Sequence, residues 1–171
     1  MILSDTALAQ AFALAGEIDL ARERITHGGE TILAFGIEGL RPDQLVLAAE
    51  VELAGGESAS ALRLADECVA ANRNARLEPH LARSLVVLAR AGACTGALSS
   101  SEAEILLGEA AELLERMDMR SHAPFVREAR SELAALRGDS STAAALRAEA
   151  VRLWTDMGAA GHARRLALGA G

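Results

Sequence analysis

The sequence predicts an all-α protein made of about four helix pairs and a short C-terminal cap helix. Hydrophobic residues make up 51% of the 171 positions but aromatic residues only 2%, and alanine is abundant, which favours closely packed helices over a sheet. Each of the three prolines is followed, thirteen or fourteen residues later, by a glycine. These intervals are Pro42–Gly56, Pro79–Gly92 and Pro124–Gly138. Proline suits a first helical turn and glycine a closing turn, so each interval predicts one helix.

The first two units follow from the same signals. Unit one, residues 4–36, begins at Ser4 or Asp5, either of which is a good N-cap, and its first helix ends at Gly16. Its second helix starts in the run IDLARERI, and the pair Gly28–Gly29 leaves open whether it continues into ETILAF. Unit two, residues 41–76, consists of PDQLVLAAEVELA, a turn at GGES, and ASALRLADECVAANRNA.

Units three and four complete the chain. Unit three, residues 78–119, has a longer loop, GACTGALSS, before a helix whose start we place at a capping box of Ser101 and Glu104. Unit four, residues 123–157, turns at GDSS, and a cap helix covers residues 161–168. Helix pairs at this period stack because no single pair buries its own apolar face. We therefore expect residues 1–171 to form one solenoid with a concave wall.

Charge and composition exclude several classes of protein. The net charge is −7, and every one of the 17 basic residues is a scattered arginine. An acidic chain of this kind matches the phosphate backbone poorly, so we expect no nucleic-acid partner. The lack of lysine excludes a Walker A motif and a Schiff-base mechanism within this chain.

The cysteines and the hydropathy pattern indicate the compartment. Cys68 and Cys94 lie far apart without a CxxC motif, which predicts two reduced, mostly buried thiols in the cytosol. No stretch approaches the roughly 20 apolar residues that span a bilayer. The N-terminal run lacks the positive segment of a signal peptide and predicts a first helix instead. We expect a cytoplasmic protein with no membrane partner.

No pattern in the chain predicts catalysis, a cofactor or a metal. None of the four histidines has a glutamate three residues before it, as a di-iron helix bundle would need. His80 and His122 each lie beside a helix-opening proline, which indicates capping. Trp154 and Met157 fit a seal beneath the cap helix better than a pocket lining. We therefore expect that the chain is not an enzyme.

The concave wall formed by the first helices is the candidate site. If the registers follow the turn glycines, the wall is apolar with acidic positions, which favours a partner helix or extended segment with some basic character. The alternative is that its glutamates only keep a groove solvated. The candidate partner-binding residues are Glu50, Arg83, Val86, Arg90, Glu128 and Glu132.

The units resemble tetratricopeptide-like repeats. The small residues Ser131, Ala143 and Ala150, with the turn Gly138–Asp139, match the small positions of that family in unit four. Unit three departs from the pattern, because Leu85 occupies the small position, and the aromatic anchors of the family are mostly absent. The resemblance implies a right-handed α–α superhelix.

A narrower resemblance covers residues 120–166 and is most specific from Leu153 to Leu166. This segment is similar to the terminal repeats of bacterial signalling ATPases, which include LuxR-type and maltose-regulator-like activators and adenylate-cyclase-linked ATPases. The resemblance implies a sensor or scaffold segment beside a nucleotide-binding domain.

Together these observations predict a non-catalytic protein-interaction or regulatory module from a bacterial signalling or transcription-regulator protein. The expected partner is a protein or peptide, with a neighbouring domain of the same protein as one candidate. The alternative is a sensor that binds a small effector in the concave groove. A homodimer through the apolar helix of residues 1–15 is a further open alternative.

Overall fold

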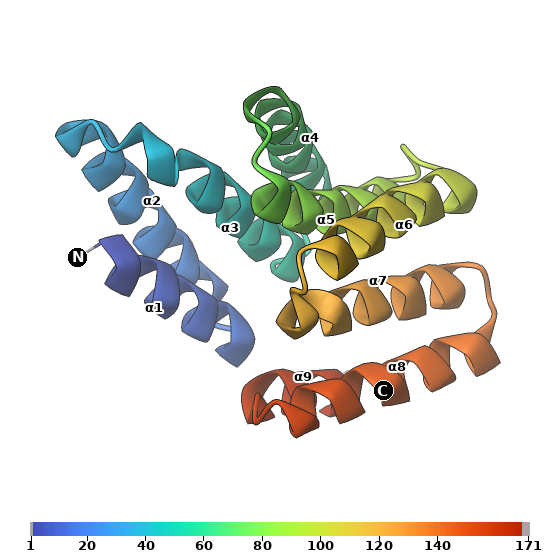
Figure 1. The fold of residues 1–171 in the computed structure, drawn as a ribbon. Helices are drawn as coiled ribbons and strands as arrows, with labels where there is room; N and C mark the ends of the chain where they lie inside the picture. Colours follow the sequence, from blue (N-terminus) through green and yellow to red (C-terminus); the bar gives the residue numbers. More distant parts are fainter. Residues whose placement is uncertain (1, 169–171) are drawn as a thin grey trace.

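The computed structural model describes residues 2–168, and over this range the chain is all-helical, which confirms the predicted fold class (Figure 1). Nine α-helices and two short 3₁₀ turns make up the described residues, which contain no strand. The elements are α1 (Ile2–Ala15), α2 (Ile18–Phe35), η1 (Glu38–Leu40), α3 (Arg41–Ala54), α4 (Ser58–Ala75), α5 (Glu78–Thr95), α6 (Ser100–Arg116), η2 (Arg120–His122), α7 (Ala123–Leu136), α8 (Ser140–Asp156) and α9 (Ala160–Leu168).

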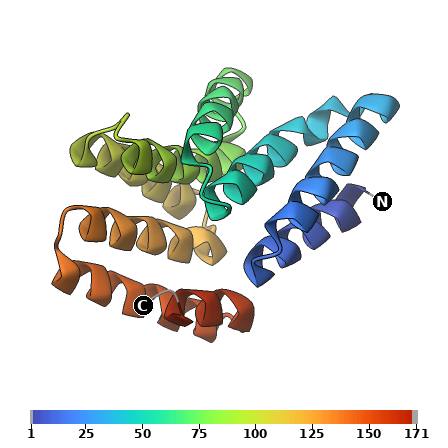
Figure 2. The ribbon, with the colours of Figure 1, turned by 180° about the vertical axis from the view of Figure 1, so that it is seen from behind.

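Each helix packs against its successive neighbours, and the odd-numbered helices also contact one another. The helix α3 contacts α1 and α5, and α5 in turn contacts α7. The chain therefore curves as an arc from α1–α2 through α5–α6 to α7–α9, and the same order is visible from behind (Figure 2). The two ends of the arc approach each other, because α1 also contacts α9.

Proline and glycine mark most helix ends as expected. Pro42, Pro79 and Pro124 all lie in the first turn of their helices, α3, α5 and α7. Two of the predicted closing glycines, Gly56 and Gly138, have φ of +81° and +78° immediately after α3 and α7. These left-handed values are the ones that glycine adopts without a steric cost.

The predicted helix end at Gly92 is wrong. Helix α5 continues through Gly92 to Thr95, and Gly96 closes it with φ of +73°. Gly92 is needed inside the helix because the side chain of Leu98 packs directly on it. A Cβ at this position would lie 2.4 Å from Cδ1 of Leu98. This glycine serves close packing and not chain reversal.

The Gly28–Gly29 pair does not interrupt α2, which runs unbroken from Ile18 to Phe35. Gly28 is buried where α3 crosses, and a Cβ there would lie 3.3 Å from Oε1 of Gln44. The missing side chain lets the Gln44 amide reach across and donate a hydrogen bond to the backbone carbonyl of Ile25. Helix continuity therefore comes from a tertiary contact that compensates for the weak helix propensity of glycine.

The capping box of α6 lies two residues before the predicted one. Ser99 is the N-cap and accepts a hydrogen bond from the backbone N–H of Glu102, whose carboxylate accepts one from the Ser99 N–H at 2.8 Å. The predicted box of Ser101 and Glu104 is therefore wrong. Glu104 instead accepts a hydrogen bond from Nε of Arg130 in α7 at 2.7 Å.

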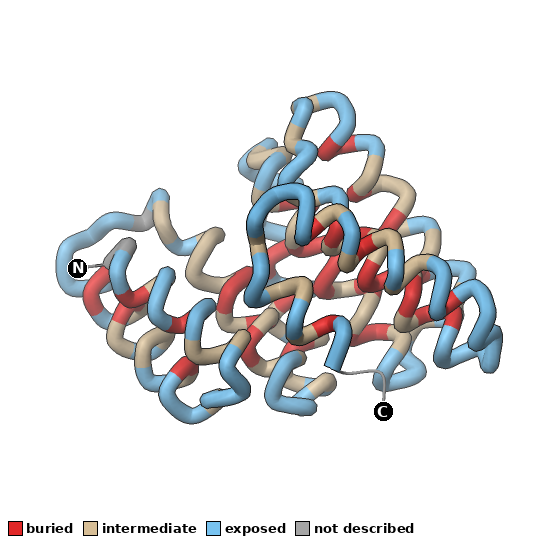
Figure 3. Tube along the Cα trace, turned by 90° about the horizontal axis from the view of Figure 1, so that it is seen from below, coloured by how far each residue is buried: buried red, intermediate tan, exposed pale blue. Residues whose placement is uncertain are grey.

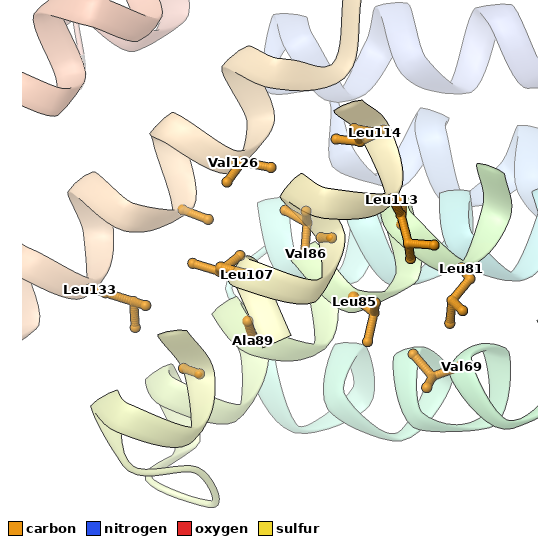
Figure 4. Close-up of a cluster of buried hydrophobic side chains, with 14 residues drawn as sticks. Val69, Leu81, Leu85, Val86, Ala89, Leu107, Leu113, Leu114, Val126 and Leu133 are labelled. Carbon is orange, nitrogen blue, oxygen red and sulfur yellow. The ribbon is translucent and has the colours of Figure 1, made fainter. Parts of the chain in front are cut away.

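Buried side chains are concentrated where successive helices meet, and the turns are exposed (Figure 3). The largest apolar cluster joins α5, α6 and α7 and extends to Val69 of α4 (Figure 4). A separate cluster lies under α9, where Trp154 packs with Leu166, so the predicted seal beneath the cap helix is confirmed for Trp154, but Trp154 also lines a pocket, contrary to the prediction. Met157 is exposed and takes no part in it.

Both cysteines are free, but only Cys68 is buried, and Cys94 is exposed, contrary to the expectation of two buried thiols. The Cys68 thiol donates to the backbone carbonyl of Pro42 in α3 and accepts a hydrogen bond from the Asn72 amide of its own helix. Burial raises the pKa of the Cys68 thiol, so the group is held in its protonated form. None of the described helices has the length and apolar character needed to cross a membrane.

Candidate functional site

The inner helices line a partly open pocket of about 320 Å³ on the inner side of the arc. Seven helices contribute to its wall, namely α1, α3, α5, α6, α7, α8 and α9. Aliphatic side chains, mostly from α1, α3 and α5, form much of its lining, and polar, charged and aromatic side chains from α1, α3, α5, η2, α7, α8 and α9 form the rest. The volume lies at the lower end of the range, roughly 300–1,000 Å³, of pockets that hold small molecules.

The first ion pair of the pocket joins Glu50 of α3 to Arg83 of α5. Nη2 of Arg83 donates to both carboxylate oxygens of Glu50, at 3.0 and 2.9 Å. Burial acts to lower the pKa of Arg83, but the charge of Glu50 and the hydrogen bond outweigh it, so the pKa is raised. The pair connects two inner helices, α3 and α5.

A second ion pair joins Arg90 of α5 to Glu132 of α7. Nε and Nη2 of Arg90 donate to the two carboxylate oxygens of Glu132, each at 2.7 Å. This two-point geometry is the one that guanidinium and carboxylate groups favour. The pKa of Arg90 is raised, because the attraction of Glu132 exceeds the effect of burial, which acts in the opposite direction.

Glu128 of α7 carries the most deeply buried carboxylate of the pocket, with 1% of the residue exposed. Its Oε1 accepts a hydrogen bond from the Trp154 indole at 2.5 Å, and its Oε2 accepts one from Nη2 of Arg165 at 2.5 Å. These donors come from α8 and α9. Glu128 therefore anchors the C-terminal helices to the inner wall, and a buried carboxylate of this kind requires both partners.

Four rings gather beside this carboxylate. The His162 ring stacks on Trp154 with centroids 4.2 Å apart, and Phe125 meets Trp154 edge-on at 4.8 Å. His122 lies at the border of the group, 6.0 Å from Phe125. Because the rings come from η2, α7, α8 and α9, the cluster exists only once the C-terminal helices are packed.

The two histidines of the pocket are held neutral. Burial lowers the pKa of His122, and the nearby charge of Arg83 lowers it further against the opposing effect of Glu50. Burial also lowers the pKa of His162, with Arg165 acting in the same direction and Glu128 against it. In the described part of the chain, the buried Nδ1 of His162 finds no hydrogen-bond partner.

The structure brings the six predicted site residues together around this pocket. Five of them line it, namely Glu50, Arg83, Val86, Arg90 and Glu128. Glu132 does not line it and instead holds Arg90 in place. The glutamates are each bonded to the chain's own donors, so an incoming basic partner would have to compete with internal arginines.

The interpretation of His80 and His122 as helix caps is wrong. The side chain of His122 makes no capping hydrogen bond to α7, and its Nδ1 lies 3.1 Å from the Ser121 hydroxyl instead. Nδ1 of His80 lies 2.9 Å from Oδ1 of Asp43 in the neighbouring helix α3. Each histidine therefore contacts a residue outside the helix that begins at its neighbouring proline, and neither side chain caps that helix.

Sequence reasoning missed the half of the pocket that the C-terminus provides, which comprises His122, Phe125, Trp154, His162 and Arg165. One signal was present: the most specific resemblance, from Leu153 to Leu166, contains three of these residues. Their convergence on Glu128 depends on the return of α9 toward the inner wall, which no local pattern encodes.

Compared with protein-family models, with curated proteins and with solved structures, the chain gives no match.

Proposed function

We propose that the chain is a non-catalytic sensor module that binds a small ligand in the central pocket, on a right-handed, tetratricopeptide-like stack of helix pairs. The observation that carries this proposal is that the two ends of the arc converge on one partly enclosed pocket. The cavity of about 320 Å³ has lining residues from both ends of the arc, whereas an extended peptide would need a long open trough. The contacts of α3 with α1 and α5, and of α5 with α7, support the stacked arrangement.

A binding role fits the pocket better than catalysis. A general base needs a carboxylate or imidazole that is free to take a proton from a substrate. Here both oxygens of Glu50, Glu128 and Glu132 accept hydrogen bonds from arginine or indole donors of the chain. As the resemblance of residues 120–166 implies, we place the module in a bacterial signalling or transcription-regulator protein in the cytoplasm.

The test is a thermal-shift screen of a broad library of small metabolites on the purified chain and on two tryptophan variants. Ala54→Trp would fill the pocket from the end of α3, where Ala54 is exposed and lines the cavity. Ala34→Trp makes the same change at an exposed site near the end of α2, which does not line the pocket. We expect compounds that stabilise the native chain and Ala34→Trp but not Ala54→Trp. If no compound shows this pattern, the proposal is wrong.

A specific surface favours protein interaction as the second candidate function. Leu33 and Phe35, at the end of α2, are 64% and 71% exposed, and Ile37 follows them in the turn. An exposed apolar group of this kind is typical of a site that a partner covers. A photo-crosslinking residue at position 35 should capture a partner in the native cell, whereas the same residue at the exposed position 63 of α4 should not.

Self-association through α1 stays a prediction. Leu8 of α1 is 43% exposed, and this helix is apolar on its outer side as well as its inner side. Light scattering of the native chain and of Leu8→Glu over a range of concentrations checks it. A chain that stays monomeric at high concentration would contradict a dimer.

A further inference from the structure

Each carboxylate oxygen of the three ion pairs at the pocket already accepts a hydrogen bond from the chain itself. Both oxygens of Glu50 accept from Arg83, and both oxygens of Glu132 accept from Arg90. The buried Glu128 accepts from Trp154 through one oxygen and from Arg165 through the other. An amine would share these oxygens with arginines that already neutralise the charge of the glutamates, so it would gain little net attraction, which disfavours amines as occupants of this pocket.

The arginines of the pocket, in contrast, keep N–H groups to spare. Each guanidinium has five N–H groups. Within the described residues, Arg83 and Arg165 each donate hydrogen bonds through Nη2 alone, and Arg90 through Nε and Nη2. The remaining contact of Arg83, with Asp43, spans 3.9 Å and is too long for a hydrogen bond. The pocket therefore offers more donors than acceptors to whatever enters it.

The charge balance limits how negative a ligand can be. Each of the three arginines is already opposed by one glutamate, so the pocket is close to neutral before a ligand enters. A phosphate dianion would bring two uncompensated charges into a partly desolvated site. A planar carboxylate brings only one charge and matches the edge of a guanidinium group.

We propose that the pocket binds a small monocarboxylate with an apolar body. This inference rests on the proposed function and names the ligand class of the same site. The carboxylate accepts hydrogen bonds from the spare N–H groups of Arg83, Arg90 or Arg165. The apolar body lies against the aliphatic part of the lining, which includes Leu14, Val51 and Leu114, and reaches Phe125.

A series of three compounds with one apolar body tests the headgroup. These probes are 3-phenylpropionate, its primary amide and 3-phenylpropylamine. Their binding to the native chain is measured by calorimetry and by the fluorescence of Trp154, the only tryptophan of the chain, which lines the pocket. We expect the carboxylate to bind about tenfold more tightly than the amide, the difference that one charge-assisted hydrogen bond makes, and the amine to bind weakest.

A double variant tests the role of the arginines. Arg90→Met with Glu132→Met removes one pair without leaving a buried charge unpaired, and should reduce the preference for the carboxylate over the amide, because one of the three arginines is lost. The matched control, Arg73→Met with Glu109→Met, removes an ion pair between α4 and α6 outside the pocket and should keep the preference. The compound series on the native chain remains a test if the double variant does not fold.

The outcomes separate this inference from the proposed function. Equal or tighter binding of the amide or the amine overturns the carboxylate preference and leaves the small-ligand pocket in place. Failure of all three probes, together with pocket-dependent stabilisation by other compounds in the metabolite screen, also overturns the ligand class alone. Failure of the probes and of the whole screen overturns both.

Discussion

At the scale of the residue, the burial of Glu128 decides how the pocket is held together. Glu128 is deeper than its partner Arg165, which is about one-third exposed, so the arginine reaches inward from the rim. A carboxylate in this position is stable only while an opposite charge and a second donor remain bonded to it. The tertiary contact of α9 therefore rests on one polar interaction as well as on apolar packing.

We expect Arg165→Met to lower the free energy of unfolding by about 3 kcal/mol, because the buried charge of Glu128 loses its counter-ion. Adding Glu128→Gln to this variant should recover part of the loss, since the amide still accepts from Trp154. Chemical denaturation measures both changes. As a control, Arg116→Met breaks the exposed pair with Glu78 and should cost less than about 1 kcal/mol. Equal losses in the two arginine variants would contradict the role of burial.

The neutral histidines give a pH dependence at the same scale. The pKa values of His122 and His162 are lowered in the folded chain by burial. The unfolded chain therefore binds more protons once the pH falls through the ordinary histidine pKa of about 6.5, so stability present above this pH is lost below it. The loss is complete when the pH has passed the folded-state values.

Unfolding measured between about pH 7 and pH 5 should therefore show a falling free energy in the native chain. In His162→Phe, which keeps a ring that can stack on Trp154, the fall should be smaller because one of the two groups no longer titrates. The same pH dependence in both proteins would show that His162 titrates alike in the folded and unfolded chains.

At the scale of the element, glycines have two different tasks in these helices. Gly56 and Gly138 reverse the chain, and each needs a positive φ. Gly92 and Gly108 lie inside helices with ordinary helical geometry, but only Gly92 has a neighbour, Leu98, in the space that a Cβ would occupy. The sequence does not distinguish the two tasks, because Gly92 follows its proline at almost the same distance as Gly56 and Gly138 follow theirs.

Substitution by alanine distinguishes them. Gly108→Ala should stabilise the chain by up to about 1 kcal/mol, the helix propensity difference, because nothing lies within 4 Å of the added Cβ. Gly92→Ala should destabilise it by about 1–3 kcal/mol, because Leu98 has to move away from a contact of 2.4 Å. Thermal unfolding of the two variants checks the opposite signs. A stabilised Gly92→Ala would mean that Leu98 repacks freely.

At the scale of the whole molecule, the return of α9 toward α1 turns an open arc of helices into a partial enclosure. Each helix pair contacts mainly its neighbours, so most of the stack does not depend on α9. The pocket does depend on it, because His162 and Arg165 form part of the wall and Leu166 covers Trp154. Enclosure and helical stacking are therefore separable properties.

A chain that ends at Ala159 tests this separation. We expect its circular dichroism to keep most of the helical signal, while the fluorescence of Trp154 shifts to the red because its cover of His162 and Leu166 is lost. Binding of pocket ligands should be lost together with the shift. An unchanged emission spectrum would show that Trp154 is shielded without α9.

The sequence by itself determined the all-helical class and most helix boundaries, because these depend on local chemistry such as Pro42 in a first turn and Gly138 after a last one. It also predicted that Glu50, Arg83 and Arg90 lie on the inner wall, because helical periodicity places such residues on one face, and all three line the pocket. Only the tertiary structure decided that Gly92 is a packing glycine and that Glu128 is bonded to Trp154 and Arg165. The physical reason is range: helix starts and ends are set within a few residues, whereas the pocket is closed by contacts between helices more than a hundred residues apart, such as α1 and α9.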